Sequence, residues 1–324
     1  MRSRTLWMLI LSMMVGLVGV GAAGVAGETA MSIEEALSLF STDDDMMISF
    51  SAEGLAQLEQ AIDAIRIELG VPDYLDETNE DQVGSFAVAP EDKDLVNKLS
   101  QAYYTLADVF LRQLPNQEET FLMGKQWGFK SLRMNPSFAV FEAQDGFIAA
   151  VEAETDIAAL NWASANWLRV AEFDIMAAVV GRIPPKAKAM VERMMELDDS
   201  YMCYGAYRAL GAFWQGLPSD PISPILIGGL RQDYDQVLAN FCRVVDEPSL
   251  CVECEGIIDP VCNEYFENRT FFVEYYLIPL KHWEDAARIL QSVIDAPIGE
   301  IYPLMNALCQ QIAAELLVDV EAHL

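Results

Sequence analysis

Apolar residues recur at intervals of three or four positions along most of the sequence, which is the spacing of one face of an α-helix. One such run starts at Ser51 and stops at Gly70, and another extends over residues 92–114. Ser32 and Glu35 have the spacing of a capping box, which predicts the start of a further short helix. No stretch shows the alternating period of a half-buried strand. The sequence therefore predicts an all-α fold.

A degenerate pattern recurs in the second half of the chain. Each copy has a small residue, a large apolar residue four positions later, another apolar residue three positions after that, and then a Pro or Asp. The large residues Val191, Phe241 and Leu290 are 50 and 49 positions apart, and a fourth copy around Phe129 has Lys125 in the small position. The aligned copies are Ala187, Val191, Met194 with Asp198; Val237, Phe241, Val244 with Pro248; and Ala286, Leu290, Val293 with Pro297.

This pattern is typical of the second helix in a tetratricopeptide-type hairpin, where the small residue lets the paired helix approach and the large one fills the groove. The period exceeds the usual value of about 34 residues, so we expect longer connections or first helices. We predict an N-terminal helical region over residues 28–120 and tetratricopeptide-like repeats, an α-solenoid or bundle, over residues 121–324, in one continuous domain. An irregular helical bundle is the alternative.

The first 27 residues have the order of a secretory signal peptide. Two Arg residues precede an uncharged stretch, 6–26, in which bulky side chains give way to small ones. We expect cleavage before Gly27 or Glu28, and an uncleaved membrane anchor is the alternative. A lipoprotein would carry a Cys directly after the apolar stretch, whereas the first Cys is Cys203. The sequence therefore predicts export to the periplasm without a lipid anchor.

The six cysteines all follow residue 202, in a chain expected to reach an oxidising compartment that permits disulfides. A zinc site built on this cluster is the alternative, but His282 and His323 are far from it and from each other in sequence. We therefore expect disulfides and no metal, with the pairing left open. The expected participants are Cys242, Cys251, Cys254 and Cys262.

The chain is strongly acidic. It has 20 Lys and Arg against 50 Asp and Glu, a formal charge of -30, and loss of the two Arg in the signal would leave 18 minus 50, or -32. This balance argues against nucleic acid and anionic lipid headgroups as partners, because either requires a cationic face. A hydrophobic content of 52% argues against intrinsic disorder.

Motifs for catalysis are missing from the sequence. The two His are scattered, and neither a nucleophile motif nor a glycine-rich phosphate loop is present. We therefore expect no enzymatic activity and no cofactor. A hydrolase with a pair of carboxylates is the remaining enzymatic alternative.

Several segments occur together in an order that carries a family resemblance. They include residues 102–104, 159–167 (Ala-Leu-Asn-Trp-Ala-Ser-Ala-Asn-Trp), 194–198, 204–213 and 283–286. This ordered set resembles the T component (TatT) of tripartite ATP-independent periplasmic (TRAP) transporters, over nearly all of the chain after the signal. The resemblance implies an all-helical periplasmic homotrimer with a central pore. It also implies docking of the solute-binding P component and handling of a small hydrophobic ligand, and typical members are lipoproteins.

Candidate contact residues follow from helical spacing. Trp162 and Trp167 are five positions apart and point in different directions on one helix, so at most one would line a groove. Tyr204, Tyr207 and Arg208 fit one helix face, and a buried Arg paired with a carboxylate is the structural alternative. The candidates for ligand or partner contact are Trp162, Trp167, Tyr204, Tyr207, Arg208 and Trp214.

We therefore expect an auxiliary T component of a TRAP transport system that binds the P component and a small ligand. A general tetratricopeptide-type envelope scaffold with no transport role is the alternative.

Overall fold

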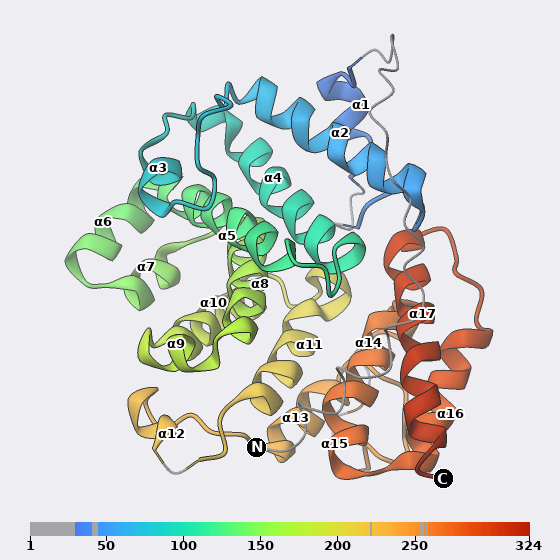
Figure 1. Ribbon diagram of the computed structural model, residues 1–324. Coiled ribbons are helices and arrows are strands. Elements are labelled where there is room, and N and C mark those ends of the chain that lie inside the picture. Colours follow the sequence, from blue (N-terminus) through green and yellow to red (C-terminus); the bar gives the residue numbers. More distant parts are fainter. Residues whose placement is uncertain (1–29, 41–44, 221, 253–255, 257) are drawn as a thin grey trace. The chain divides into compact units, whose positions relative to one another are not determined.

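The computed structural model describes residues 30–324 except 41–44, 221, 253–255 and 257. The expected signal peptide, residues 1–27, lies outside the described residues. The compact unit Met31–Leu324 contains the predicted repeat region and all but the first three residues of the predicted N-terminal region. Its described residues form helices and one isolated bridge between Phe40 and Met46, with no strand among them, which confirms the predicted all-α fold (Figure 1).

The helix bounds are as follows. In chain order the helices are α1 (Ile33–Leu37), α2 (Ala52–Glu68), α3 (Glu80–Ser85), α4 (Lys93–Thr105), α5 (Gln117–Met134), α6 (Pro136–Gln144), α7 (Phe147–Ala153), α8 (Ile157–Phe173), α9 (Ile175–Val180), α10 (Ile183–Leu197), α11 (Tyr201–Gly216), α12 (Ser223–Leu226), α13 (Tyr234–Phe241), α14 (Phe266–Phe272), α15 (Ile278–Leu280), α16 (Trp283–Asp295) and α17 (Pro303–Glu321). The described residues also form two 3-10 segments, η1 (Pro90–Asp92) and η3 (Pro260–Glu264), and two π-helical segments, η2 (Leu106–Phe110) and η4 (Val273–Leu277).

The predicted helix starts are local and occur where their capping residues stand. The Ser32 hydroxyl accepts from the Glu35 amide at 3.2 Å, and the Glu35 carboxylate accepts from the Ser32 amide at 2.9 Å. The Ser51 hydroxyl caps α2 by accepting from the amide of Gly54 at 3.2 Å. Each cap satisfies amides that the first helical turn leaves without a partner.

From α4 onward the helices pack as successive hairpins (Figure 1). α4 packs against α5, α8 against α10, α11 against α13, and α14 with η4 against α16. The first helix of each pair also contacts the second helix of the preceding pair, and α17 ends the series against α14 and α16. This order of contacts is that of a stacked helical-repeat protein, in which each unit buries its apolar face against its neighbours.

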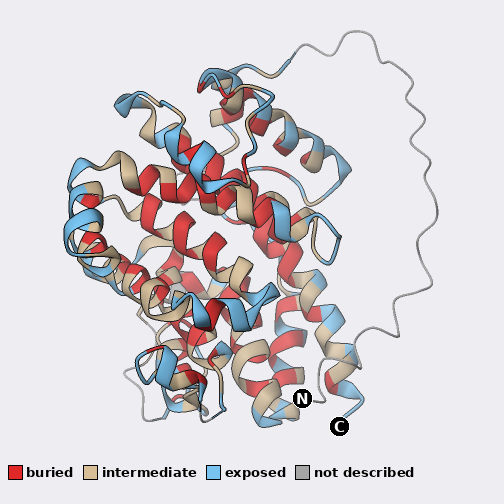
Figure 2. Ribbon diagram, turned by 60° about the vertical axis from the view of Figure 1, so that its left-hand side comes forward, coloured by how far each residue is buried: buried red, intermediate tan, exposed pale blue. Residues whose placement is uncertain are grey.

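The anchor residues of the sequence pattern occupy the core of this stack. Val191, Phe241 and Leu290 are all buried, and so are the small residues that precede them. Figure 2 shows buried positions along the inward sides of the helices and exposed positions on their outer sides. In one copy the predicted helix is too long, because α13 ends at Phe241 and Val244 lies in the following turn. There the chain turns to form a disulfide between Cys242 and Cys251.

In the degenerate fourth copy, two glycines near Lys125 allow the paired helix to approach. Lys125 takes the small position of the pattern and directs its ammonium toward Glu80, at 3.8 Å. One residue earlier, a Cβ at Gly124 would lie 2.3 Å from the side chain of Asn166 on α8. A Cβ at Gly128 would lie 2.7 Å from the Cα of Ala163. The absence of these side chains therefore permits the close approach of α5 and α8.

The N-terminal helices are tied to the repeats by a buried carboxylate. Glu77, in the connection between α2 and α3, accepts hydrogen bonds from the Tyr103 hydroxyl at 2.8 Å and the Trp127 indole at 2.6 Å. The Arg66 guanidinium of α2 lies 2.9 Å from the same carboxylate. One acidic side chain thus connects α2, α4 and α5 and offsets the cost of its burial with charge-assisted bonds.

Candidate functional site

The two tryptophans proposed as contact residues are both buried. Trp167 packs on Phe129, with ring centroids 4.9 Å apart, and on Phe147 at 5.7 Å. It therefore belongs to the core formed by α5, α7, α8 and α10. Trp162 lies on the other side of α8, where its ring is 5.7 Å from that of Tyr104 on α4. The structure thus separates the two, as the five-residue spacing indicates.

Arg208 is buried and paired. Its guanidinium lies 2.7 Å from Glu267, donates to the amide oxygen of Asn268 at 2.7 Å, and stands over the ring of Tyr265 at 4.7 Å. The Glu267 carboxylate raises the pKa of Arg208 although burial alone would lower it. These contacts join α11 to α14, so Arg208 has the structural role that was the alternative.

The predicted common face of Tyr204, Tyr207 and Arg208 is wrong in one respect. Met202, Cys203 and Tyr204 have φ values of 50° to 60°, the left-handed region, so Tyr204 precedes the regular part of α11. The rings of Tyr204 and Tyr207 still lie 6.4 Å apart, both half-buried. This geometry could not be derived from helical spacing, because the spacing assumes right-handed turns throughout.

Trp214 is half-buried and lies where three hydrophobic clusters meet. Its ring packs edge-on against Phe213 at 5.6 Å, and the Lys188 ammonium stands 6.0 Å from its centroid. The Lys188 contact joins α10 to α11, and the Phe213 contact lies within α11.

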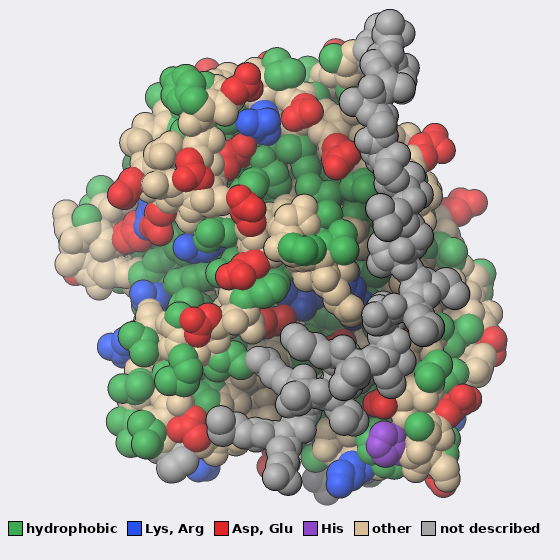
Figure 3. Space-filling view, viewed as in Figure 1, with side chains coloured by type: hydrophobic (Ala, Val, Ile, Leu, Met, Phe, Trp, Pro, Cys, Tyr) green, Lys and Arg blue, Asp and Glu red, His purple; other side chains and the backbone are tan. Residues whose placement is uncertain are grey.

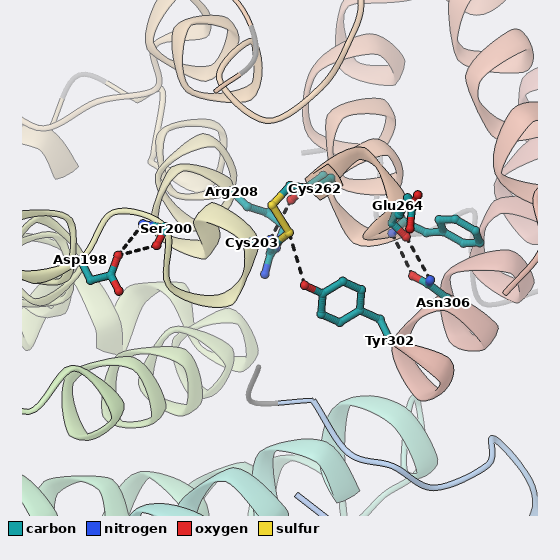
Figure 4. Close-up of a disulfide and its surroundings, with 10 residues drawn as sticks. Asp198, Ser200, Cys203, Arg208, Cys262, Glu264, Tyr302 and Asn306 are labelled. Carbon is teal, nitrogen blue, oxygen red and sulfur yellow. Dashed lines mark hydrogen bonds between the residues drawn. A yellow bond between two sulfur atoms is a disulfide. The ribbon is translucent and has the colours of Figure 1, made fainter. Parts of the chain in front are cut away.

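A disulfide fixes the left-handed turn (Figure 4). Cys203 pairs with Cys262, which joins the start of α11 to η3 just before α14. The Tyr302 hydroxyl donates to Cys203 Sγ at 3.5 Å. Nearby, the Asn306 side chain accepts from the Phe266 amide and donates to the Glu264 carbonyl, each at 3.0 Å. α17 is thereby held against the segment that carries Arg208's partners.

The cysteine pairing differs from the expected set in one member. Cys242 and Cys251 pair with each other, and Cys262 pairs with Cys203, which was not among the expected participants. Cys254 lies outside the described residues. Cys309 is free and fully buried, and burial raises the pKa of its thiol.

A second group of polar side chains, not among the predicted candidates, lies on the first helices of successive hairpins. Arg169 of α8 forms a 2.6 Å ion pair with Asp108 of η2, and its other amino group lies 3.4 Å from Glu172. Tyr104 lies one turn before Asp108, and its hydroxyl interacts electrostatically with the Arg169 guanidinium. Burial and the Asp108 charge raise the pKa of the Tyr104 hydroxyl, so this group is a hydrogen-bond donor at neutral pH.

The η4 segment adds two further groups to the field around Arg169. Burial raises the pKa of Glu274, against the opposing charges of Arg112 and Arg169. Burial and the Glu274 charge raise the pKa of Tyr275 well above its usual value. We call Tyr104, Asp108, Arg169, Glu274 and Tyr275 the Arg169 cluster.

Three members of the Arg169 cluster lie on π-helical segments. Asp108 is in η2, which continues α4, and Glu274 and Tyr275 are in η4, which continues α14. A π-helical turn inserts one residue into a helix and redirects the side chains that follow, and such turns are frequent at functional sites. Here the η2 turn places Asp108 in an ion pair with Arg169, and the η4 turn carries Glu274 and Tyr275, which interact with Arg169 through their charges.

The Arg169 cluster is partly exposed to solvent and has aromatic rings beside it. The Arg169 side chain is 20% exposed, and Tyr104 and Tyr275 are half-buried. The Tyr104 ring lies 5.6 Å from Phe121 and the Tyr275 ring 5.0 Å from Phe271. Figure 3 shows a face hollowed near its middle, where hydrophobic and basic side chains lie below a rim with Asp and Glu. Such a mixture can bind a small molecule with an apolar body and a hydrogen-bonding end.

Helical spacing contained a signal for this cluster. Tyr104 and Asp108 are four positions apart, and Trp162 and Arg169 are seven apart, so each pair shares one helix face. Each pair places an aromatic ring and a charged group on one side of its helix. The sequence could not show that these two faces meet, because they belong to separate hairpins.

None of the helices in the described part of the chain combines the length and the apolar composition needed to cross a bilayer. In comparisons with known proteins, no family model matches this chain and no curated protein matches it.

Proposed function

We propose that this protein is an auxiliary periplasmic T component of a TRAP transport system, which binds the solute-receptor P component and a small ligand. The observation that carries the proposal is the Arg169 cluster, in which three separate hairpins place hydrogen-bonding groups beside aromatic rings. The order of the stacked hairpins also supports it, because the segments that resemble the T component follow one another along these helices.

The ligand that suits this cluster has an apolar body and a polar end. The half-buried ring of Tyr104 offers an apolar surface, and the buried rings of Phe121 and Trp162 pack against it with centroids 5.6 and 5.7 Å away. Tyr hydroxyls and the Arg169 guanidinium offer donors near these rings. A carboxyl group such as Glu274, whose pKa is raised by burial, adds a donor whenever it is protonated.

Partner binding follows from charge. A homotrimer would concentrate about 96 negative charges, three times the 32 of the processed chain, so its docking face must be locally neutral or basic, or the receptor must present a complementary positive patch. Binding between receptor and trimer should then weaken as the salt concentration rises.

The test is affinity purification of the native protein from an envelope fraction, followed by mass spectrometry of co-purified proteins and small molecules. We expect a periplasmic solute receptor and a small amphipathic compound. Recovery of unrelated proteins alone at native salt, and a monomer by light scattering at micromolar concentration, would contradict the proposal.

A pair of matched variants links the ligand to the cluster. Arg169→Met removes an arginine that is 20% exposed, and Arg193→Met removes one that is 22% exposed and paired with Glu196. We expect Arg169→Met to lose the co-purified compound and Arg193→Met to retain it. Tyr104→Phe removes a hydroxyl without changing the packing volume, and it should weaken retention while leaving the circular dichroism spectrum unchanged. Equal retention by all three variants would place the ligand elsewhere.

A further inference from the structure

The ion pairs around Arg169 leave two opposite charges without a partner. Arg169 lies 2.6 Å from Asp108 and 3.4 Å from Glu172, so its guanidinium is satisfied. Glu274 of η4 and Arg112, in the turn after η2, form neither a hydrogen bond nor an ion pair with any described residue. Both side chains are half-buried. A carboxylate and a guanidinium thus lose part of their contact with water and gain no direct partner in return.

The two unpaired groups are near each other but do not touch. Arg112 contributes the strongest of the charges that act on the Glu274 carboxyl, and Arg169 contributes the next. The Arg112 guanidinium and the Glu274 carboxylate nevertheless lie more than 4.0 Å apart. Burial outweighs their attraction and raises the pKa of Glu274. A molecule that carries both signs of charge can therefore bridge the two groups.

The fold holds both groups in place. Arg112 lies in the turn between η2 and α5, where the Gln117 side chain of α5 accepts a hydrogen bond from the Gln113 amide at 3.1 Å. Glu274 directly follows Val273, which is fully buried. Each charge is thus carried by an ordered backbone segment, and groups that are already ordered lose little conformational entropy when a ligand binds.

Two tyrosine rings lie beside these charges. Tyr275 follows Glu274 in η4, and Tyr104 interacts with Arg169. Both rings are half-buried, so part of each is open to a ligand. An apolar group of the ligand can pack on these rings while its charged groups reach Glu274 and Arg112.

We propose that this site binds a free α-amino acid with an apolar side chain, whose ammonium group pairs with Glu274 and whose carboxylate pairs with Arg112. The inference rests on the proposed function, because it names the ligand class of the Arg169 cluster. A zwitterion supplies both missing partners at once, and each pair is a charge-assisted hydrogen bond. An ion of one sign would satisfy one group and leave the other half-buried and unpaired. The ammonium group also stabilises the ionised form of Glu274 against the effect of burial.

The test is isothermal titration calorimetry on the processed chain from Glu28, which contains the whole compact unit Met31–Leu324. Unfolding with intact disulfides, dialysis and refolding first remove any small molecule carried over from the cells. The probes are L-phenylalanine, L-leucine and two analogues that each lack one charge: hydrocinnamate has no ammonium group and phenethylamine has no carboxylate. We expect both amino acids to bind. Each analogue should bind about tenfold or more weakly than L-phenylalanine, because one charge-assisted hydrogen bond is lost.

Two variants assign the ends of the ligand. Glu274→Gln should weaken the binding of L-phenylalanine by about tenfold or more, while hydrocinnamate, which has no ammonium group, loses no affinity. Arg112→Gln should weaken L-phenylalanine to a similar extent, while phenethylamine, which has no carboxylate, loses none. A merely structural role of either residue would weaken all three ligands alike.

Matched controls use the same substitutions at exposed positions. Arg231 and Glu152 are exposed, and neither forms an ion pair with a described residue. Arg231→Gln and Glu152→Gln should therefore bind L-phenylalanine as the unsubstituted chain does, within about twofold.

Three results would overturn the inference. They are no binding of either amino acid at millimolar concentration, equal affinity for L-phenylalanine and its two analogues, and an equal loss of all three ligands in the Glu274 and Arg112 variants. None of these results bears on recovery of a solute receptor from the envelope, so the proposed function would still stand if the receptor co-purifies. Amino-acid binding without any receptor would contradict the transport role and leave this inference intact.

Discussion

Gly211 of α11 lies so close to Phe241 of α13 that a Cβ atom at position 211 would be 2.5 Å from Cε2 of the phenylalanine ring. Phe241 is fully buried and is one of the three large anchors of the repeat pattern. The anchor thus fills its groove only because the facing helix has no side chain at that point. This contact has a direct consequence for stability.

Substitution Gly211→Ala should lower the free energy of unfolding by about 1–2 kcal/mol. The methyl group overlaps the Phe241 ring, and the cost of overpacking exceeds the helix propensity that Ala adds. Gly216→Ala, at the end of the same helix with nothing within 4 Å of its Cβ, is the control and should not destabilise the protein. Urea unfolding measures both, and equal stability of the two variants would contradict the packing explanation.

Breaking the buried ion pair between Arg208 and Glu267 should strongly lower the free energy of unfolding. Glu267→Gln leaves the Arg208 charge buried without its carboxylate, which costs about 3–5 kcal/mol. The double substitution with Arg208→Met should recover part of this loss, because no unpaired charge is left behind. Glu247→Gln is the control, since its partner Arg288 is 51% exposed and exposed ion pairs contribute at most about 1 kcal/mol. Similar losses of stability in Glu267→Gln and Glu247→Gln would contradict the larger contribution expected of the buried ion pair.

The two disulfides should differ in their contribution to stability. Cys203 and Cys262 are separated by 59 residues and Cys242 and Cys251 by 9, so their removal should cost about 4 and about 3 kcal/mol in the loop-entropy account. Double Cys→Ala variants of each pair, compared by denaturant unfolding, test this order. A larger loss from the shorter loop would show that contacts of the Cys242–Cys251 disulfide in the folded protein, and not loop closure, dominate.

Asp45 should make stability depend on pH in the acidic range. Burial, with a contribution from the Glu267 charge, raises the pKa of Asp45 from 3.8 to about 7 in the folded protein. Between these values the folded state keeps a proton that the unfolded chain releases. The free energy of unfolding therefore falls as pH rises through this window, by up to about 1.4 kcal/mol per pH unit.

Asp45→Asn removes the titrating group and should flatten this part of the pH profile. Thermal or urea unfolding at several pH values between about 4 and about 7 provides the comparison. A variant that kept the slope of the unsubstituted protein would assign the dependence to another carboxyl.

The sequence by itself determined the helical class and the local helix starts. Ser32 and Ser51 cap their helices within a single turn, so the few residues that predict each helix start are also those that form it. The buried positions of Val191, Phe241 and Leu290 were also predictable, because a three-and-four spacing defines one helix face. These features depend on neighbours close in sequence.

Only the tertiary structure decided which distant residues meet. Cys203 pairs with Cys262 through a left-handed turn that no helical spacing predicts. Arg169 meets Asp108 because α8 packs against the hairpin that precedes it and a π-helical turn redirects the carboxylate. Such pairings depend on the geometry between helices that lie some 60 residues apart in sequence, and periodicity along one helix contains no information about it.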